Sequence, residues 1–184
     1  MQRVAPGGLR ETGLLPWLLS RGGGLTMGTE PLTLFSTLGR NRRLFRRWLF
    51  FASGLMPRGR LPRTDTELVI LRVAYLRGCD YERNHHLRIG RRAGLTREQI
   101  EATSTGPSDP IWTDRQRAVL TAVDALVRDG DVNDETWASL RRHLSERDCI
   151  EFCLLVGHYV MLAMTIAALR IQPETAKRSR LSRG

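Results

Sequence analysis

Nine consecutive residues, from Gly78 to His86, hold one of the three cysteines and two of the four histidines of this chain. The thiol of Cys79, the carboxylate of Glu82 and the imidazole of His86 all fall within them. On a helix, residues three, four and seven apart share one face, so these three side chains would form a single stripe. A thiol, a carboxylate and an imidazole on one face can serve as nucleophile, general acid and general base.

The position of Cys79 bears on its reactivity. Gly78 is expected to end the preceding helix, which places Cys79 at or near the N-terminus of the next one. The positive end of the helix dipole would stabilise a thiolate there. His86 lies two turns further on and is a candidate base, and Glu82, one turn from it, could orient its ring or carry a proton.

Plainer interpretations of the same residues exist. A Glu–His pair one turn apart also stabilises a helix without any chemistry. Glu82 and His85 fit the Glu-x-x-His pattern of di-iron bundles, but such bundles need a second copy and further glutamates. Glu151 and His158 are seven residues apart and do not supply it. We therefore expect neither a metal ion nor a cofactor.

Two predicted helices must position the stripe. The first spans 63–77, and its run from Leu68 to Leu76 is apolar almost all round, so this helix should be central and buried. Glu67 stands at its beginning. The second spans 79–94. If the two form a tight antiparallel pair, Glu67 lies a full helix length from Cys79. Glu67 would then reach the stripe only through helix packing that the sequence does not show, or from a neighbouring subunit.

The segment from Leu61 to about Ile100 resembles the carboxymuconolactone decarboxylase and alkylhydroperoxidase D-like (AhpD-like) family. In the peroxidase branch of that family the signature is a glutamate followed by Cys-x-x-Cys-x-x-x-His. Here Glu82 replaces the second cysteine, which attacks the peroxide in that branch. The decarboxylase branch carries Glu-x-x-x-His, as Glu82 and His86 do. The matching residues are Glu67, Leu68, Gly78, Cys79, His86 and the run Arg91-Arg92-Ala93-Gly94-Leu95-Thr96.

The resemblance implies a fold and a site. The fold would be an all-α, AhpD-like multi-helix domain with a central buried C-terminal helix, assembled as a homo-oligomer. The catalytic residues would be Glu67, Cys79, Glu82 and His86. We expect substrate contacts from three further side chains, those of Tyr81, His85 and His158.

Two reactions are compatible with this resemblance. The first is thiol-dependent hydroperoxide reduction, a peroxiredoxin-type antioxidant activity of Cys79 with Glu67 and His86. It would need an external thiol reductant, because the second motif cysteine is missing and Cys149 and Cys153 are expected to be packing residues. The alternative is acid–base decarboxylation or lactone processing by Glu82 and His86, with arginines binding the acid group of a small carboxylated substrate.

A third class of function is a basic binding module. The net charge is +10, nearly all of it from arginines spread over the chain. The segment from Arg91 to Ile100 also resembles the turn of a helix-turn-helix. Phe152 to Leu169 is eighteen residues without formal charge, near the minimum for a membrane span, but it stands alone. We expect a small-molecule substrate, neither nucleic acid nor membrane as partner, and a cytoplasmic location.

The predicted organisation has three parts. Residues 1–30 are expected to be a flexible N-terminal arm, with at most a short helical turn near Leu14 to Ser20 and a joint at the Gly22–Gly24 run. Residues 31–172 form the helical domain, with the core motif at 61–100. Residues 173–184 are predicted to be a basic disordered tail.

Overall fold

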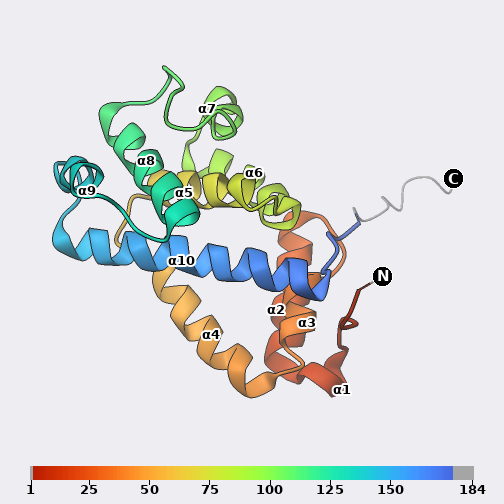
Figure 1. The fold of residues 1–184 in the computed structure, drawn as a ribbon. Helices are drawn as coiled ribbons and strands as arrows, with labels where there is room; N and C mark the ends of the chain where they lie inside the picture. Colours follow the sequence, from red (N-terminus) through yellow and green to blue (C-terminus); the bar gives the residue numbers. More distant parts are fainter. Residues whose placement is uncertain (1, 176–184) are drawn as a thin grey trace, which may run out of the picture. The chain divides into compact units, whose positions relative to one another are not determined.

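The protein is all-α across the part of the chain that the computed structural model describes, residues 2–175, which holds ten helices and no strand. The predicted fold class is therefore confirmed. The described chain divides into two compact units, residues 2–50 with 166–175, and residues 51–165. Figure 1 shows the course of the helices. Residues 176–184 of the predicted tail lie outside the described residues.

The N-terminal segment is more helical than predicted. Helix α1 spans Leu9–Thr12 and α2 spans Leu14–Met27, so the prediction of at most a short turn is wrong. The glycines of α2 permit close packing instead of forming a joint. A Cβ at Gly24 would lie 2.4 Å from the carbonyl oxygen of Glu30, and one at Gly23 would lie 2.3 Å from Leu32. Only glycine allows the following chain to approach the helix this closely.

Helices α3 (Thr33–Leu38) and α4 (Arg42–Leu55) follow. The side chain of Asn41 accepts a hydrogen bond from the backbone N–H of Leu44 at 3.2 Å, so Asn41 caps α4 as an N-terminal asparagine commonly does. Helix α4 begins in the first unit and ends in the second.

Helix α5 (Arg63–Leu76) is the core of the second unit, as its sequence predicted. Ten consecutive residues, from Asp65 to Ala74, are buried. The helix packs against α6 (Asp80–Ala93) and α8 (Asp114–Asp129), and Figure 1 shows α5 alongside α6. Gly78, at φ +58°, turns the chain from α5 into α6. Left-handed backbone of this kind favours glycine.

A buried ion pair ties α5 to α8. Nε of Arg72 lies 2.6 Å from one oxygen of Asp124, and Nη2 lies 2.7 Å from the other. The same guanidinium donates hydrogen bonds to the carbonyl oxygens of Thr103 and Ser104. A bidentate pair with its remaining donors satisfied holds two elements in one geometry.

The second unit also contains two short helices, α7 and α9. Thr96 and Gln99 form the predicted capping box at the start of α7 (Arg97–Ala102). Helix α9 (Asp134–Arg141) packs against α8 and is capped by the side chain of Asn133.

Helix α10 (Glu146–Leu169) is the long C-terminal helix. Among the described helices it is the one that is long and apolar enough to cross a membrane, judged by length and composition alone. Its inner face is buried, as predicted for a central helix. The buried residues of that face within the second unit are Cys149, Phe152, Leu155, Val156, His158, Tyr159, Leu162 and Ala163.

Candidate active site

Three side chains from the two predicted helices meet inside the second unit. Nδ1 of His86 on α6 lies 2.6 Å from Oε2 of Glu67 on α5. Nε2 of His86 lies 3.4 Å from Oε2 of Glu82, one turn earlier on α6. All three residues are buried, at 0%, 5% and 4% exposure for Glu67, Glu82 and His86. Glu67 thus reaches the stripe within one chain, which the sequence had left open.

The crossing of α5 and α6 explains how Glu67 reaches His86. The helices run antiparallel through the tight turn at Gly78, so residues early in α5 face residues late in α6. Gly90, one turn beyond His86, has no side chain, and a Cβ there would lie 3.7 Å from that of Glu67. The glutamate therefore stands opposite the middle of α6, away from Cys79.

Tyr159 on α10 is a fourth member, which the sequence analysis missed. Its hydroxyl lies 3.5 Å from Nε2 of His86, and the two rings meet edge to face at 5.4 Å. The hydroxyl also lies 3.7 Å from the sulfur of Met56. A signal existed in the sequence. Tyr159 falls at helical spacing from Phe152 and Leu155, on the face that α10 buries, and a buried tyrosine hydroxyl usually has a polar partner.

The protonation of His86 is decided by its two carboxylate neighbours. Burial lowers the pKa of its imidazole. Hydrogen bonds to Glu67 and Glu82, together with their negative charges, outweigh burial and raise the pKa to about 9. At neutral pH both ring nitrogens therefore carry protons, and the N–H groups donate to the two glutamates.

The two carboxylates differ in what holds them. Nη2 of Arg63, on a side chain 36% exposed, lies 2.9 Å from Oε1 of Glu67, close enough for an ion pair although not aligned as a hydrogen bond. Oε1 of Glu82 is buried and has no hydrogen-bond partner in the part of the chain that the structure describes. A buried carboxylate oxygen without a donor is costly, and in native proteins such an atom commonly serves a ligand, a water molecule or catalysis.

Cys79 begins α6 as its N-cap, where the sequence placed it, but the expected stabilised thiolate is not found. Burial raises the pKa of the thiol. Backbone N–H groups of Glu82 and Tyr81 lower it by less, and the negative charge of Glu82 raises it further. Desolvation thus outweighs the helix N-terminus. All three cysteines are free thiols.

The three predicted substrate-contacting residues lie in two places, His158 on α10 beside Tyr159, and Tyr81 with His85 on α6. His158 is buried on α10, and its ring packs edge to face against Tyr159 at 5.3 Å and Phe51 at 5.5 Å. Burial lowers the pKa of its imidazole, and the negative charge of Glu82 opposes this in part, so His158 is neutral. The effect of Glu82 shows that His158 lies close enough to the site to interact with its charges. Tyr81 and His85 instead stack on each other along α6, with ring centroids 4.7 Å apart.

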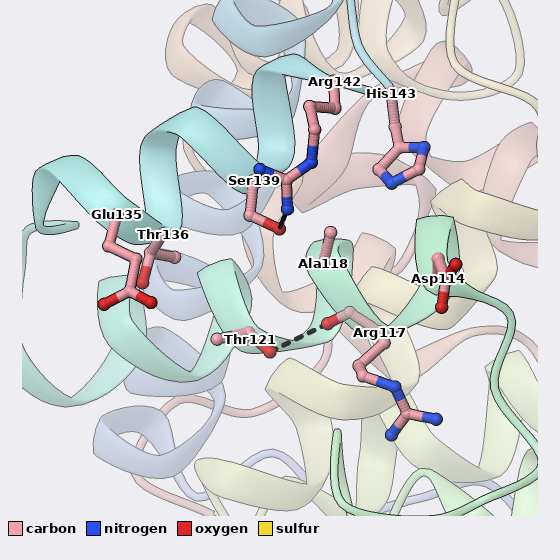
Figure 2. A pocket seen from close by; sticks show the side chains of 9 residues that line it. All are labelled: Asp114, Arg117, Ala118, Thr121, Glu135, Thr136, Ser139, Arg142 and His143. Carbon is pink, nitrogen blue, oxygen red and sulfur yellow. Dashed lines mark hydrogen bonds between the residues drawn. The ribbon is translucent and has the colours of Figure 1, made fainter.

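A separate surface pocket of about 530 Å³ lies between α8 and α9. No residue of the Glu67–His86–Glu82 site lines it. Figure 2 shows the lining residues and the hydrogen bonds among them. The hydroxyl of Thr121 donates to the carbonyl oxygen of Arg117, and the guanidinium of Arg142 donates to the hydroxyl of Ser139. Within the described residues, no three His, Cys, Asp or Glu side chains are placed to hold a metal ion.

Comparison with protein families supports the resemblance seen in the sequence. Residues 42–125 match the model of the carboxymuconolactone decarboxylase family. This segment contains Glu67, Cys79, Glu82 and His86, and stops before Tyr159. A comparison with curated proteins finds no match of significance.

Several solved structures share the fold. An AhpD-core, peroxidase-related protein from Ralstonia eutropha JMP134 superposes with a TM-score of 0.81 at 18% identity, over 94% of this chain and 92% of the other. The debrominase Bmp8 gives 0.79 at 21% identity, over the same shares. A protein of unknown function from Agrobacterium tumefaciens, suggested to be the antioxidant defence protein AhpD, gives 0.66 at 22% identity, over 72% of this chain and 91% of the other. At these identities the likeness concerns the fold.

Proposed function

We propose that this chain, whose residues 42–125 match the model of the carboxymuconolactone decarboxylase family, is an enzyme of acid–base chemistry on a small carboxylated or lactone-like compound. The observation that carries the proposal is the buried relay from Glu67 through doubly protonated His86 to Glu82. A proton can pass along this relay without entering bulk water. General acid–base catalysis of this kind contributes about 10²–10⁴-fold in rate.

Glu82 is the group that exchanges a proton with the substrate. One of its oxygens faces His86, and the other has no hydrogen-bond partner among residues 2–175, so the second is available to a reacting atom. His86 supplies this proton to Glu82 through Nε2, and the carboxylate of Glu67, which accepts the hydrogen bond of Nδ1, favours the return of the ring to its charged form. Tyr159 stays a neutral hydroxyl, because burial and then the charges of Glu82 and Glu67 raise its pKa well above its usual value.

Decarboxylation balances on these groups and one molecule of water. The bond between the substrate carbon and its carboxylate breaks, carbon dioxide leaves, and the electron pair moves into a conjugated carbonyl of the substrate. The Nε2 proton of His86 passes through the Glu82 carboxylate to the carbon, and His86 then regains a proton from water, which leaves as hydroxide. Arg63, charged and partly exposed beside Glu67, is placed to attract the acid group of an arriving substrate.

Thiol-dependent peroxide reduction is the second candidate, favoured by the position of Cys79 at the start of α6. Its thiolate would attack the peroxide, releasing an alcohol and leaving a sulfenic acid. Two equivalents of an external thiol would then return the cysteine to its thiol and form a disulfide and water. The raised pKa of Cys79 and the glutamate at the second motif position support the acid–base reaction over this one. Because proteins of similar fold are described as AhpD or peroxidase-related, peroxide reduction is assayed beside the acid–base reaction.

Two isosteric variants decide between the candidates. Purified wild type, Glu82→Gln and Cys79→Ser are assayed on a panel of lactones and β-keto acids, and for peroxide consumption with several thiols. We expect Glu82→Gln to lose at least about 100-fold of the acid–base activity and Cys79→Ser to retain most of it. Glu101→Gln, at an exposed ion pair on α7, is the matched carboxylate control. Loss of peroxide turnover in Cys79→Ser, with full activity in Glu82→Gln, would contradict the acid–base function.

A further inference from the structure

The loop that joins α4 to α5, residues 56–62, borders the candidate active site. Its first residue, Met56, places its sulfur 3.7 Å from the hydroxyl of Tyr159, which lies 3.5 Å from Nε2 of His86. All four side chains of the site are at most 5% exposed. A substrate can therefore reach Glu82 only if a neighbouring segment moves, and enzymes commonly open such sites through loops.

One side chain of α10 holds this loop. Both carboxylate oxygens of Glu151 accept the backbone N–H of Arg60, each at 2.8 Å, and Oε1 also accepts the N–H of Leu61, at 3.0 Å. Hydrogen bonds from backbone N–H groups to a carboxylate are charge-assisted, and they are stronger than bonds between neutral groups. Glu151 thus binds two successive residues of the loop.

Gly59 shows how closely the loop fits against this carboxylate. A Cβ at position 59 would lie 2.4 Å from Oε1 of Glu151 and 2.4 Å from the carbonyl oxygen of Leu55. The carbonyl of Leu55 belongs to the backbone and cannot swing aside. The loop can therefore close on Glu151 only while position 59 has no side chain.

Two further polar contacts of the loop are weaker. The N–H of Arg58 donates to the carbonyl oxygen of Ser53 at 3.3 Å, which is long for such a bond. The side chain of Arg60, 59% exposed, lies 3.3 Å from Asp148, and exposed ion pairs contribute little. Helix α5, in contrast, is buried through ten consecutive residues. The loop is thus released from the site more easily than the helix that follows it.

We propose that Glu151 is a positioning residue of the site. Its carboxylate holds the 56–62 loop closed, with Met56 against Tyr159, and substrate reaches Glu82 when the loop leaves Glu151. The closed loop keeps water from the buried proton relay during the reaction. The nature of the substrate rests on the proposed function, whereas the hold of Glu151 on the loop is measured without a substrate.

The charge of the loop suits a carboxylated compound. Arg58 and Arg60 are exposed, and Arg63, the first residue of α5, is 36% exposed beside Glu67. Cationic side chains at an entrance raise the local concentration of an anionic substrate. The loop that closes the site thus also attracts the class of compound on which the site is proposed to act.

Hydrogen exchange of the Arg60 and Leu61 amides, followed by NMR on the full chain, measures how firmly the loop is held. Glu151→Ala removes the acceptor and Gly59→Ala obstructs its seat. Each should speed the exchange of both amides at least about tenfold, the factor that one hydrogen bond to a charged group is worth. Circular dichroism confirms that each variant folds.

Two matched controls should leave both exchange rates unchanged. Glu146→Ala removes an 86% exposed carboxylate from the first turn of the same helix. Gly54→Ala adds a methyl group to α4 where a Cβ meets nothing within 4 Å. Oxidation of Met56 by chloramine T, read by peptide mass mapping, reports whether its sulfur leaves Tyr159, and it should rise only in the two loop variants.

Added acetate separates positioning from a loss of stability. In Glu151→Ala, acetate at about 0.2 M, compared with sodium chloride at equal ionic strength, can occupy the two vacated N–H groups and should restore part of their protection. Gly59→Ala should not respond, because its methyl group fills the seat. With a substrate found in the acid–base assay, Glu151→Ala should lower kcat at least about tenfold without raising KM, and acetate should restore part of kcat.

The outcomes distinguish this proposal from the proposed function. Unchanged amide exchange or unchanged Met56 oxidation in Glu151→Ala would overturn the role of Glu151, as would exchange that acetate does not slow. A kcat and KM equal to those of the wild type would do the same. Failure of the proposed function shows instead as a wild-type protein without acid–base turnover, and the exchange and oxidation measurements then still decide the role of Glu151.

Discussion

Replacing Glu67 by glutamine tests the electrostatics of the site directly. The change keeps the shape of the side chain but removes the charge that lies 2.6 Å from Nδ1 of His86. In the wild type the two glutamates raise the pKa of His86 from 6.5 to about 9 against the effect of burial. Without Glu67, burial and the more distant Glu82 remain, so we expect the pKa to fall by about two or more.

The net free energy of holding His86 charged, with burial and both glutamates included, follows from the same shift. Raising the pKa from 6.5 to about 9 corresponds to stabilisation on the order of 3 kcal/mol. In a chain of this length that is about 6–12 °C in melting temperature. The folded state holds the extra proton, so the stabilisation is complete below about pH 6.5 and is lost as pH rises through about 9. The difference between wild type and Glu67→Gln should therefore shrink above about pH 9.

Two measurements check the reasoning. Heteronuclear NMR titration of the histidine side chains reports the pKa of His86 in each protein, and denaturant unfolding from about pH 6 to about pH 10 reports stability. Glu101→Gln is the control, because its partner Arg97 and the glutamate are 74% and 62% exposed. An exposed pair contributes about 1 kcal/mol or less. A wild-type His86 that titrates near 6.5, or a pKa unmoved by Glu67→Gln, would refute the role given to Glu67.

Three further predictions concern other parts of the second unit. Asp124→Asn leaves the buried Arg72 guanidinium short of its counter-charge and should cost about 3–5 kcal/mol in denaturant unfolding; a loss below about 1 kcal/mol would count against a stabilising role of the Arg72–Asp124 ion pair. Gly94→Ala should cost about 1–3 kcal/mol through its φ of +107° alone, since its new methyl meets only Thr64, at 3.7 Å; an unchanged melting temperature would contradict this. Cys79 should react slowly with iodoacetamide at neutral pH and rapidly in denaturant, followed by peptide mass mapping; rapid labelling of the native protein would show that its pKa is not raised.

Local chemistry accounts for the parts of the fold that were predicted. The glycine after α5 and the Thr96–Gln99 capping box act through a few neighbouring residues, so spacing alone locates the helix ends. The helix through Gly22–Gly24 was missed for the opposite reason. Glycine usually weakens a helix, but at Gly23 and Gly24 the chain that follows the helix lies too close for any side chain. That approach comes from residues in another segment and leaves no local pattern.

The candidate site divides in the same way. The sequence by itself determined that Glu82 and His86 share one face, because helix geometry places residues four apart together wherever the helix lies. Only the tertiary structure decided that Glu67 and Tyr159 complete the site, since both come from other helices. It also decided the protonation of the groups. Burial and charged neighbours set the pKa of His86 and Cys79, and these depend on which side chains packing brings within a few ångströms.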